Sequence, residues 1–504
     1  MRVYIITLLL FFFHEAVFSQ PKKDQLFSLS ENEWNYSTSL LRELLAIPND
    51  ASYEEHVAQN VDWCTKAFTK LGFDIHLLST DKVPLLLAER KVKKAKKTVL
   101  FYLQIDGQPV DTSHWQQESP YLPVLKQRTA NGTWEAIDWK NVTDAYNPEY
   151  RVFARSASDA KGPVAMFLTA LSIMEKQKWQ ANYNIKVIMD FEEELGSPHL
   201  PGAVVQYKDL LSADMLVILD GPRHITNQPT LTFGARGIAT IALTVFGPRV
   251  PQHSGHYGNY APNPALRLSQ LLASMKDNQG RVTIPGFYDG ITLSDEVKEI
   301  LRNVPDDEEQ IQRSVGIARP DGVAGTYQEA LQYPSLNIRG MESAWTGDKV
   351  RTIVPDKALA EIDIRLVLEN DPEKQIMLVK QHVINQGYHL VEGTPTEEER
   401  KTYTHLANFD YTVSYRAYRT DFDSEVGQWL YRSLKRSFEV EPIRQRTSGG
   451  SIPISPFVNT LGIPAVTVPT VNRDNNQHSP NENIRMGNYL EGIVTCLGIL
   501  TEKL

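Results

Sequence analysis

The most constraining feature of this sequence is a series of near-continuous apolar runs that alternate with helical patterns in its first half. Residues 97–106, 184–191 and 213–220 read KTVLFYLQID, NIKVIMDF and ADMLVILD. Runs of this length and composition indicate strands that are buried on both faces. A helical pattern, GPVAMFLTALSIMEKQK, separates the first two runs. We therefore predict an α/β domain whose mostly parallel sheet is covered by helices on both faces.

The pattern changes near Arg236, where a half-exposed strand pattern is followed by amphipathic helices and further strands. This mixture is typical of a smaller α+β domain, with a charged and poorly periodic excursion at residues 286–330. The α/β pattern returns near Phe422. The predicted organisation is a main domain in two parts with an insert between them: residues 20–235, an inserted domain at 236–400, and residues 401–504.

The N-terminus resembles a secretory signal. Met1 and Arg2 are followed by an apolar run, VYIITLLLFFF, and small residues precede Gln20. We expect cleavage near Ser19 and export to a periplasm or to the outside of the cell. The run is shorter than the roughly twenty residues that span a bilayer. An uncleaved anchor, or a cytosolic protein whose first residues mimic a signal, are the alternatives.

Composition narrows the classes of partner. The 504 residues include 52 Lys plus Arg and 61 Asp plus Glu, which gives a net charge of -9. This balance does not favour binding to nucleic acids or, after signal cleavage, to a membrane, so small solutes and metal cations are the expected partners. The chain has two cysteines, Cys64 and Cys496. Neither fits a thiolate metal site, and we predict that both are buried free thiols.

Polar side chains close several of the apolar runs or lie in loops next to them. Gln104 and Asp106 lie two residues apart at a strand end, so they point to the same face. The others are Asp159 before a helix, Glu192 to Glu194 after NIKVIMDF, Asp220 after ADMLVIL, and His478 after IPAVTVP. Each one alone is ordinarily a solvated loop residue. Together, at one edge of a sheet, they form the set that a metal-dependent hydrolase requires.

The ordered motifs of this chain resemble those of a known family. The family is the dinuclear zinc peptidases that include carboxypeptidase G, carnosinase-type dipeptidases, aminoacylases and succinyl-diaminopimelate desuccinylase. The motifs cover nearly the whole mature chain and are DGQPVD, SASDAKGP, EEELGS, LVILD, HSGHYGN, NPALRL, VRTIVP with IDIRLV, SGGSIPIS and HSPNE. The resemblance implies a catalytic domain with an inserted α+β domain that serves as a lid and dimerisation domain, and hence a homodimer.

The resemblance also implies a role for each polar residue. Asp159 is expected to bridge two metal ions, with Glu194 and His478 completing site one and Asp220 serving site two. Asp106 would orient the ligand two residues before it. Glu193 would be the general base that takes a proton from the metal-bound water.

Further roles fall in or near the insert. His253 resembles the family's lid histidine, which stabilises the developing oxyanion and often comes from the other subunit of a dimer. Asn337, Arg365 and Gly450 lie at positions where the family holds the carboxylate or backbone of the substrate.

The chain departs from the family pattern at Gln104, at Leu103 and at Ala160, where many relatives carry a second Asp. The family has a metal-binding His where this chain has Gln104, and usually a Gly at the position of Leu103. Site two would then consist of Gln104, Asp159 and Asp220, which offer only oxygen ligands. This set favours Mn, Mg or Ca over Zn, or an empty position. We expect Zn in site one and a second divalent ion, Zn, Mn or Co, weakly held in site two. If site two is intact, His114 is the first candidate to replace the missing ligand.

The sequence thus predicts an exported metallopeptidase that hydrolyses an amide bond in a dipeptide, a short peptide or an N-acyl amino acid. The alternative is a catalytically impaired binding or regulatory protein on the same scaffold, because Gln104 replaces a metal ligand. Retention of Glu193 favours an enzyme, since a pure binder does not need a spare base.

Overall fold

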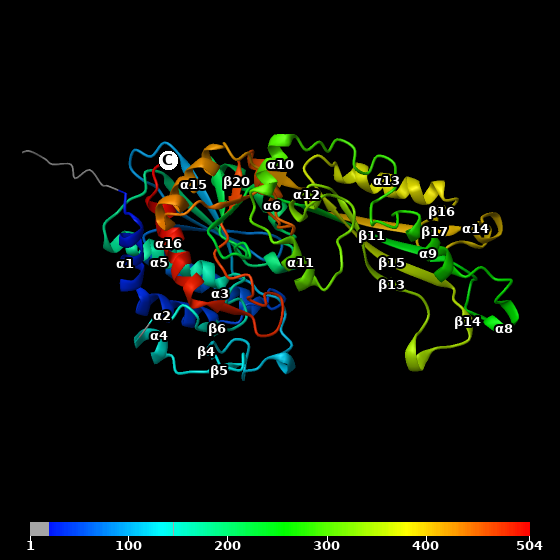
Figure 1. Cartoon of the computed structure of the whole chain (residues 1–504), viewed down its shortest axis with the longest axis horizontal. Helices are drawn as coiled ribbons and strands as arrows, with labels where there is room; N and C mark the ends of the chain where they lie inside the picture. The colour runs from blue at the N-terminus through cyan, green and yellow to red at the C-terminus, as the bar shows by residue number, and fades with distance from the viewer. Residues whose placement is uncertain (1–19, 145) are drawn as a thin grey trace, which may run out of the picture.

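The computed structural model describes residues 20–144 and 146–504. The predicted signal sequence, residues 1–19, lies outside the described residues. The chain forms two lobes, a larger one that contains both ends of the described chain and a smaller one built from the insert (Figure 1).

An eight-stranded sheet lies at the centre of the larger lobe. Its central strands run parallel to one another, and antiparallel neighbours occur towards its edges. In spatial order the strands are β1 (Asp74–Leu78), β2 (Leu85–Arg90), β7 (Asn184–Asp190), β3 (Thr98–Gln104), β8 (Met215–Ile218), β20 (Ala465–Thr467), β9 (Thr230–Thr232) and β19 (Ile443–Gln445). The predicted α/β class is confirmed.

Helices cover both faces of this sheet because its central strands alternate apolar side chains between two cores. On β3, Phe101 and Leu103 join one core, whereas Leu100 and Tyr102 join the other. The first face is covered by α1 (Lys23–Asn32), α2 (Trp34–Leu45), α3 (Glu54–Lys70), α5 (Lys161–Lys176), α15 (Glu425–Phe438) and α16 (Met486–Thr501). The second is covered by α6 (Leu200–Gln206), α7 (Lys208–Leu211) and η4 (Phe457–Leu461).

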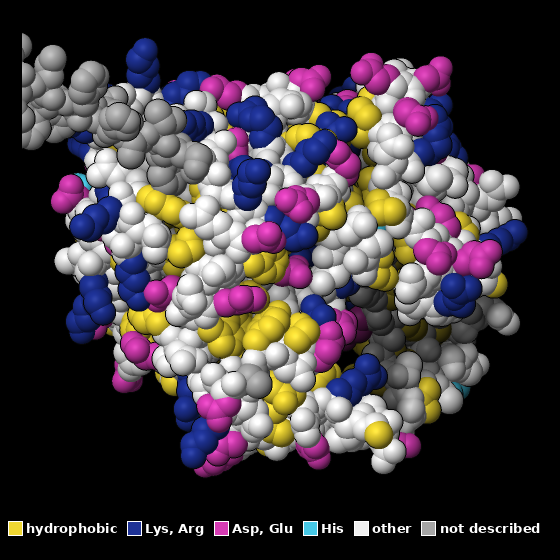
Figure 2. Space-filling model, turned by 60° about the vertical axis from the view of Figure 1, so that its left-hand side comes forward, with side chains coloured by type: hydrophobic (Ala, Val, Ile, Leu, Met, Phe, Trp, Pro, Cys, Tyr) yellow, Lys and Arg dark blue, Asp and Glu magenta, His cyan; other side chains and the backbone are white. Residues whose placement is uncertain are grey.

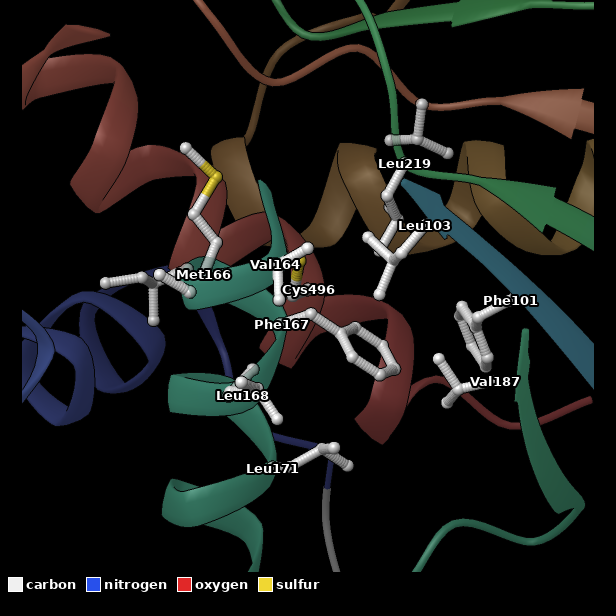
Figure 3. Close-up of a cluster of buried hydrophobic side chains, with 14 of the residues drawn as sticks. Phe101, Leu103, Val164, Met166, Phe167, Leu168, Leu171, Val187, Leu219 and Cys496 are labelled. Carbon is white, nitrogen blue, oxygen red and sulfur yellow. The ribbon is translucent and has the colours of Figure 1, made fainter. Parts of the chain in front are cut away.

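Helix α5 is apolar on nearly all sides and is therefore central to the first core. Figure 3 shows Val164, Phe167 and Leu171 of α5 beside Phe101 of β3 and Val187 of β7. Cys496 of α16 lies in the same core, and both cysteines are buried free thiols, as predicted. Burial raises the pKa of the Cys64 thiol to about 12, which keeps it protonated and unreactive.

The insert is built on a five-stranded sheet. In spatial order its strands are β13 (Ser335–Glu342), β15 (Lys357–Leu366), β11 (Gly237–Phe246), β17 (Leu406–Tyr415) and β16 (His389–Val391). Alternate residues of β11 are buried beneath α9 (Pro264–Ala273) and α13 (Pro372–Asn385). Strand β17 pairs with β11 along its length. The insert sheet therefore continues past residue 400, where the sequence analysis placed the domain boundary.

The charged excursion of the insert contains three short helices. They are α10 (Asp295–Arg302), α11 (Glu308–Val315) and α12 (Tyr327–Ala330). The side chains of Ser294, Asp307 and Thr326 accept hydrogen bonds from backbone N–H groups of the first turns, which satisfies donors that would otherwise lack partners. Each helix buries at most one of its residues, so the excursion adds little to the core of the insert.

A second sheet of the larger lobe was not predicted. Its strands, in spatial order, are β21 (Asn483–Arg485), β6 (Arg151–Phe153), β4 (Val124–Arg128) and β5 (Trp134–Ala136). The pairing of Asn483 with Phe153 joins two distant parts of the chain. Since Asp159 follows β6 and His478 precedes β21 by a few residues, this pairing brings both side chains to one place.

The remaining described elements are short. They are η1 (Thr112–His114), α4 (Lys140–Asp144), η2 (Glu193–Leu195), β10 (Gly234–Ala235), β12 (Gln252–His253), α8 (Ser254–Tyr257), η3 (Gly347–Lys349), β14 (Ile353–Val354), α14 (Glu397–Thr402) and β18 (Tyr418–Arg419). Across residues 20–144 and 146–504, no helix has the length and apolar character needed to cross a bilayer. On the face shown in Figure 2, Lys and Arg side chains are interspersed with Asp and Glu.

Candidate active site and metal centre

A cavity lies at the carboxyl ends of the central strands. Because β3, β7 and β8 run parallel, the residues that follow them meet at one edge of the sheet. The cavity has a volume of about 910 Å³. Its lining includes six of the predicted site residues: Gln104, Asp159, Glu193, Asp220, Gly450 and His478. The sequence pattern of polar strand ends therefore does mark one site.

Three of the predicted ligands form a cluster. The Nε2 atom of His478 lies 3.0 Å from Oδ2 of Asp159 and 3.3 Å from Oε2 of Glu194. One ligand atom from each of these residues lies within 4.8 Å of the others. The carboxylates are buried, with side-chain exposures of 8% for Asp159 and 3% for Glu194, whereas His478 is half exposed. This is the set assigned to site one from the sequence.

Gln104 lies next to the bridging position. Its Nε2 atom donates a hydrogen bond of 2.9 Å to Oδ1 of Asp159. Its Oε1 atom is buried and has no hydrogen-bond partner within the described part of the chain. A buried carbonyl oxygen without a partner is costly. If the amide group rotated, Oε1 would take the place of Nε2 beside Asp159, where a cation shared with that carboxylate would satisfy it.

The electrostatics of the cavity favour cation binding. Burial raises the pKa of Glu193 well above its usual range, with further contributions from the charges of Asp220 and Asp159. Burial and the charge of Asp159 also raise the pKa of Asp220 to about 7 and that of Glu194 to about 8. Glu193, Glu194 and Asp220 thus hold protons more tightly than ordinary carboxyl groups. Divalent ions would relieve this repulsion.

The residues present fit a metal centre. Asp159, Glu194 and His478 offer two carboxylates and an imidazole at one point, which is a donor set that suits Zn. Gln104, Asp159 and Asp220 offer oxygen atoms alone, which suits harder ions. The unpartnered Oε1 of Gln104 is consistent with a ligand role at this second position.

Asp106 has a different contact from the one expected. Its Oδ1 accepts a hydrogen bond of 3.0 Å from the backbone N–H of Glu193, and its Oδ2 accepts one of 2.9 Å from that of Glu194. Since a carboxamide is not an imidazole, Gln104 has no ring N–H that Asp106 could orient. In this chain, therefore, Asp106 fixes the backbone of the two glutamates.

Three supporting residues were missed by the sequence analysis. Gln108 donates a hydrogen bond of 2.8 Å to Oε2 of Glu194, and Gln477 donates one of 3.2 Å to Oδ2 of Asp159. The buried carboxylate of Glu482 accepts backbone N–H groups from Ser156, Ser158 and Asp159. Gln108 and Glu482 stand inside the quoted motifs DGQPVD and HSPNE, and Gln477 directly precedes the second. Their position in these motifs was the available signal.

The other predicted site residues lie at different distances from this cluster. Gly450 lines the cavity. Arg365 donates a hydrogen bond of 2.9 Å to Oγ of Ser451, which also lines the cavity. Asn337 lies on β13 opposite Asp363 and donates a hydrogen bond of 2.8 Å to it.

Two histidines stand apart from the cavity. His253 is exposed on β12 and is absent from the cavity lining formed by the described residues. Figure 1 shows the neighbouring α8 and β14 at the far end of the insert. His114 has a side chain that is 70% exposed and lies 3.5 Å from Asp111. It is not part of the three-residue cluster found among the described side chains.

Comparisons with known proteins agree with this geometry. Residues 124–502 match the model of "Peptidase family M20/M25/M40". The Cys-Gly metallodipeptidase dug1 of Schizosaccharomyces pombe is 25% identical over 491 residues, which cover 93% of this chain and 96% of that protein. The Beta-Ala-His dipeptidase of Mus musculus is 28% identical over 417 residues, or 81% of this chain and 77% of that protein.

A solved structure shows the same fold. The M20 family metallo-carboxypeptidase Sso-CP2 from Sulfolobus solfataricus superposes with a TM-score of 0.76 at 28% identity, covering 92% of this chain and 98% of that one. The resemblance inferred from the motifs is thereby confirmed. Because the family match spans more than half of the sequence, the chain belongs to peptidase family M20/M25/M40 and is a metallopeptidase.

Proposed function

We propose that this protein is an exported, metal-dependent dipeptidase that hydrolyses the amide bond of dipeptides, with short peptides and N-acyl amino acids as further candidate substrates. The observation that carries the proposal is the Asp159–Glu194–His478 cluster with Glu193 in the wall of the same cavity. The dipeptidase names of the relatives from Schizosaccharomyces pombe and Mus musculus support this substrate class.

Glu193 is the proposed general base. Divalent ions held by the cluster would acidify a water molecule and polarise the scissile carbonyl. The carboxylate of Glu193 faces the cavity while Asp106 holds its backbone N–H, so its position is fixed relative to Glu194. Its raised pKa suits a group that accepts a proton from the attacking water and then delivers it to the leaving amine nitrogen.

The proposed metal content is unequal. Site one, with Asp159, Glu194 and His478, would hold Zn. Site two, with Gln104, Asp159 and Asp220, would hold a second divalent ion, Zn, Mn or Co, more weakly. Two features support this difference. Site two offers only oxygen ligands, and Oδ1 of Asp159 accepts a hydrogen bond from the amide of Gln104.

The substrate's carboxylate would be held near Arg365, Asn337 and Gly450. The contact between Arg365 and Ser451 supports this placement because it brings a guanidinium group to the cavity wall. Guanidinium groups bind carboxylates strongly through paired hydrogen bonds.

Export and dimerisation are the remaining parts of the proposal. The signal-like start of the sequence supports an exported location. Cleavage near Ser19 would release the protein from the membrane. A homodimer would allow the exposed His253 to reach the cavity of the partner subunit, which supports pairing through the insert.

The experiment that tests the function is a hydrolysis screen on the purified mature protein. Dipeptides, tripeptides and N-acyl amino acids are compared before and after treatment with a chelator, and the metal content is measured on the same sample. Hydrolysis that is lost with the metal is the expected result. Bound metal without hydrolysis of any substrate would favour the catalytically impaired binding protein, the reading that the amide contact between Gln104 and Asp159 also favours.

A further inference from the structure

The insert contributes a wall to the catalytic cavity through α12. Tyr327 and Leu331 line the same cavity as Gln104 and Asp159. Within the described lining, they are the two residues that come from the insert, and the rest belong to the larger lobe. Tyr327 is 38% exposed and Leu331 is 9% exposed. The aromatic ring is therefore available to a ligand, and the leucine forms part of the surface beneath it.

This wall lies next to the position proposed for the substrate carboxylate. A Cβ atom on Gly449 would lie 3.4 Å from Cδ2 of Leu331 and 3.7 Å from the hydroxyl oxygen of Tyr327. Ser451, which contacts Arg365, is two residues further on. Two residues of extended chain span at most about 7 Å. A substrate held by its carboxylate at Arg365 would thus present its C-terminal side chain to α12.

The chemistry of the wall suits an apolar side chain. Leu331 offers an aliphatic group, Tyr327 offers a ring, and Gly449 leaves the space between them free of its own side chain. Burial of an apolar group against such a surface is favourable in proportion to the area removed from water.

A buried hydrogen-bond network holds α12 against the larger lobe. Nε2 of His224, which follows β8, lies 2.8 Å from Oδ1 of Asp306, between α10 and α11. Oδ2 of Asp306 accepts a hydrogen bond of 2.7 Å from Nε2 of Gln328 in α12. His224 is 6% exposed and Gln328 is 2% exposed. The network therefore joins α12 of the insert to the segment that follows β8 in the larger lobe.

The protonation state of this network follows from its contacts. Nδ1 of His224 accepts the backbone N–H of Thr226 at 3.2 Å. A ring that accepts at Nδ1 carries its proton on Nε2, so His224 is the donor to Asp306. Oε1 of Gln328 has no partner among the described residues. The amide of Gln328 can consequently reverse and accept a hydrogen bond in place of donating one.

We propose that α12 determines which C-terminal residue this peptidase accepts. Tyr327 and Leu331 contact an apolar side chain of that residue, and His224, Asp306 and Gln328 are positioning residues that keep α12 at the cavity. The inference rests on the proposed dipeptidase function and adds the side-chain class of the substrate to it.

The first test is a series of dipeptides with one N-terminal residue and Gly, Leu, Phe or Glu at the C-terminus. In the wild type, kcat/KM should be highest with Leu or Phe. Leu331→Ala and Tyr327→Ala should each lower the Leu-to-Gly ratio of kcat/KM by about tenfold or more, the scale of hydrophobic-pocket discrimination. Leu331→Lys should raise the relative rate with Glu. Val315→Ala, on exposed α11 and outside the lining formed by the described residues, is the matched control and should leave the ratio unchanged.

The second test separates positioning from general damage. Asp306→Ala should collapse the Leu-to-Gly ratio, mainly through a higher KM for the Leu substrate, while metal content and kcat on the Gly substrate stay near wild type. Asp306→Asn should restore the ratio, because the reversed amide of Gln328 can accept from the new Asn. Melting temperatures of all variants show whether each one is folded.

The results separate the role of α12 from the dipeptidase function on which it depends. Hydrolysis of dipeptides by the wild type, with a Leu-to-Gly ratio that neither Leu331→Ala nor Tyr327→Ala changes, would overturn the role of α12 and leave the dipeptidase intact. If Asp306→Ala and Asp306→Asn lower the Leu-to-Gly ratio equally, the positioning role of His224, Asp306 and Gln328 is wrong, whereas the role of Tyr327 and Leu331 stands. A wild type that retains metal and cleaves no dipeptide would overturn both proposals.

Discussion

Two adjacent glutamates in this site have different surroundings, although the sequence presents them as equivalent. Glu194 lies beside His478 and receives a hydrogen bond from Gln108, so its carboxylate belongs to the ligand cluster. Glu193 lines the cavity, and the contact with Asp106 is made by its backbone N–H and not by its carboxylate. Adjacent residues cannot easily bind the same ion, which leaves the second carboxylate free to move a proton.

Conversion of each glutamate to glutamine should therefore have a different effect. Glu193→Gln should abolish turnover while metal content stays near wild type, because an amide cannot accept the proton and the ligands are intact. Glu194→Gln should lose metal as well as activity. Metal analysis of both purified variants, together with kcat on one dipeptide, checks this assignment. Equal metal loss in the two variants would show that the roles of Glu193 and Glu194 are wrongly assigned.

Gln104 is the residue at which this chain departs most from its family pattern. If it weakens site two, the purified protein should hold one tightly bound zinc ion and a second ion that exchanges, and added Mn or Co should raise activity. Affinity at the second position should be lower by something like 10- to 100-fold, as for other disturbed metal sites. Gln104→His should restore tight double occupancy, measured as zinc per chain after dialysis.

The control for this prediction is His114→Ala. Its side chain is exposed and paired with Asp111, so its removal should change neither zinc content nor activity. Two equally tight zinc ions in the wild type would contradict the assignment of site two, and their loss in His114→Ala would identify the replacement ligand.

At the scale of elements, the strand ends could be predicted and the connection between distant loops could not. Gln104, Glu193 and Asp220 follow apolar strands whose parallel arrangement is readable from the alternation with helices. Asp159 and His478 meet because β6 pairs with β21, and these strands have three residues each. Strands this short have too few residues for a period-two pattern, so their pairing depends on tertiary contacts that the sequence does not display.

Glu482 stabilises this connection. Its carboxylate is 1% exposed, accepts three backbone N–H groups around Asp159 and lies 2.8 Å from a guanidinium nitrogen of Arg155. Glu482→Ala would leave the buried Arg155 and these donors without partners, and removal of one member of a buried ion pair costs about 3–5 kcal/mol. We expect a lower melting temperature together with weaker zinc binding. Glu502→Ala, which also removes a buried carboxylate paired with arginines but near the C-terminus, should lower stability without changing the affinity for zinc.

At the scale of the whole molecule, two distant regions of the insert are proposed to serve catalysis. Near the larger lobe, Arg365 and α12 reach the cavity. At the other end, His253 is exposed, and its Nδ1 accepts the N–H of Gly255 at 3.0 Å. The neutral ring then carries its proton on Nε2 and can donate it to an oxyanion. One chain does not bring this group to its own cavity, so the proposed role of His253 requires a second copy.

The last prediction follows from this separation. Light scattering should give the mass of a homodimer, and His253→Ala should lower kcat by about 10²- to 10³-fold, as for loss of a single oxyanion donor, with metal content and dimer mass unchanged. His256→Ala is the matched control, since His256 lies on the adjoining helix α8, its ring lies 4.8 Å from that of His253, and it is also exposed. Mixing inactive Glu193→Gln with inactive His253→Ala should recover activity, because a mixed dimer contains one cavity with an intact Glu193 and an intact histidine from the partner. If the protein is a monomer and His253→Ala leaves kcat unchanged, both the predicted homodimer and the oxyanion role of His253 are wrong.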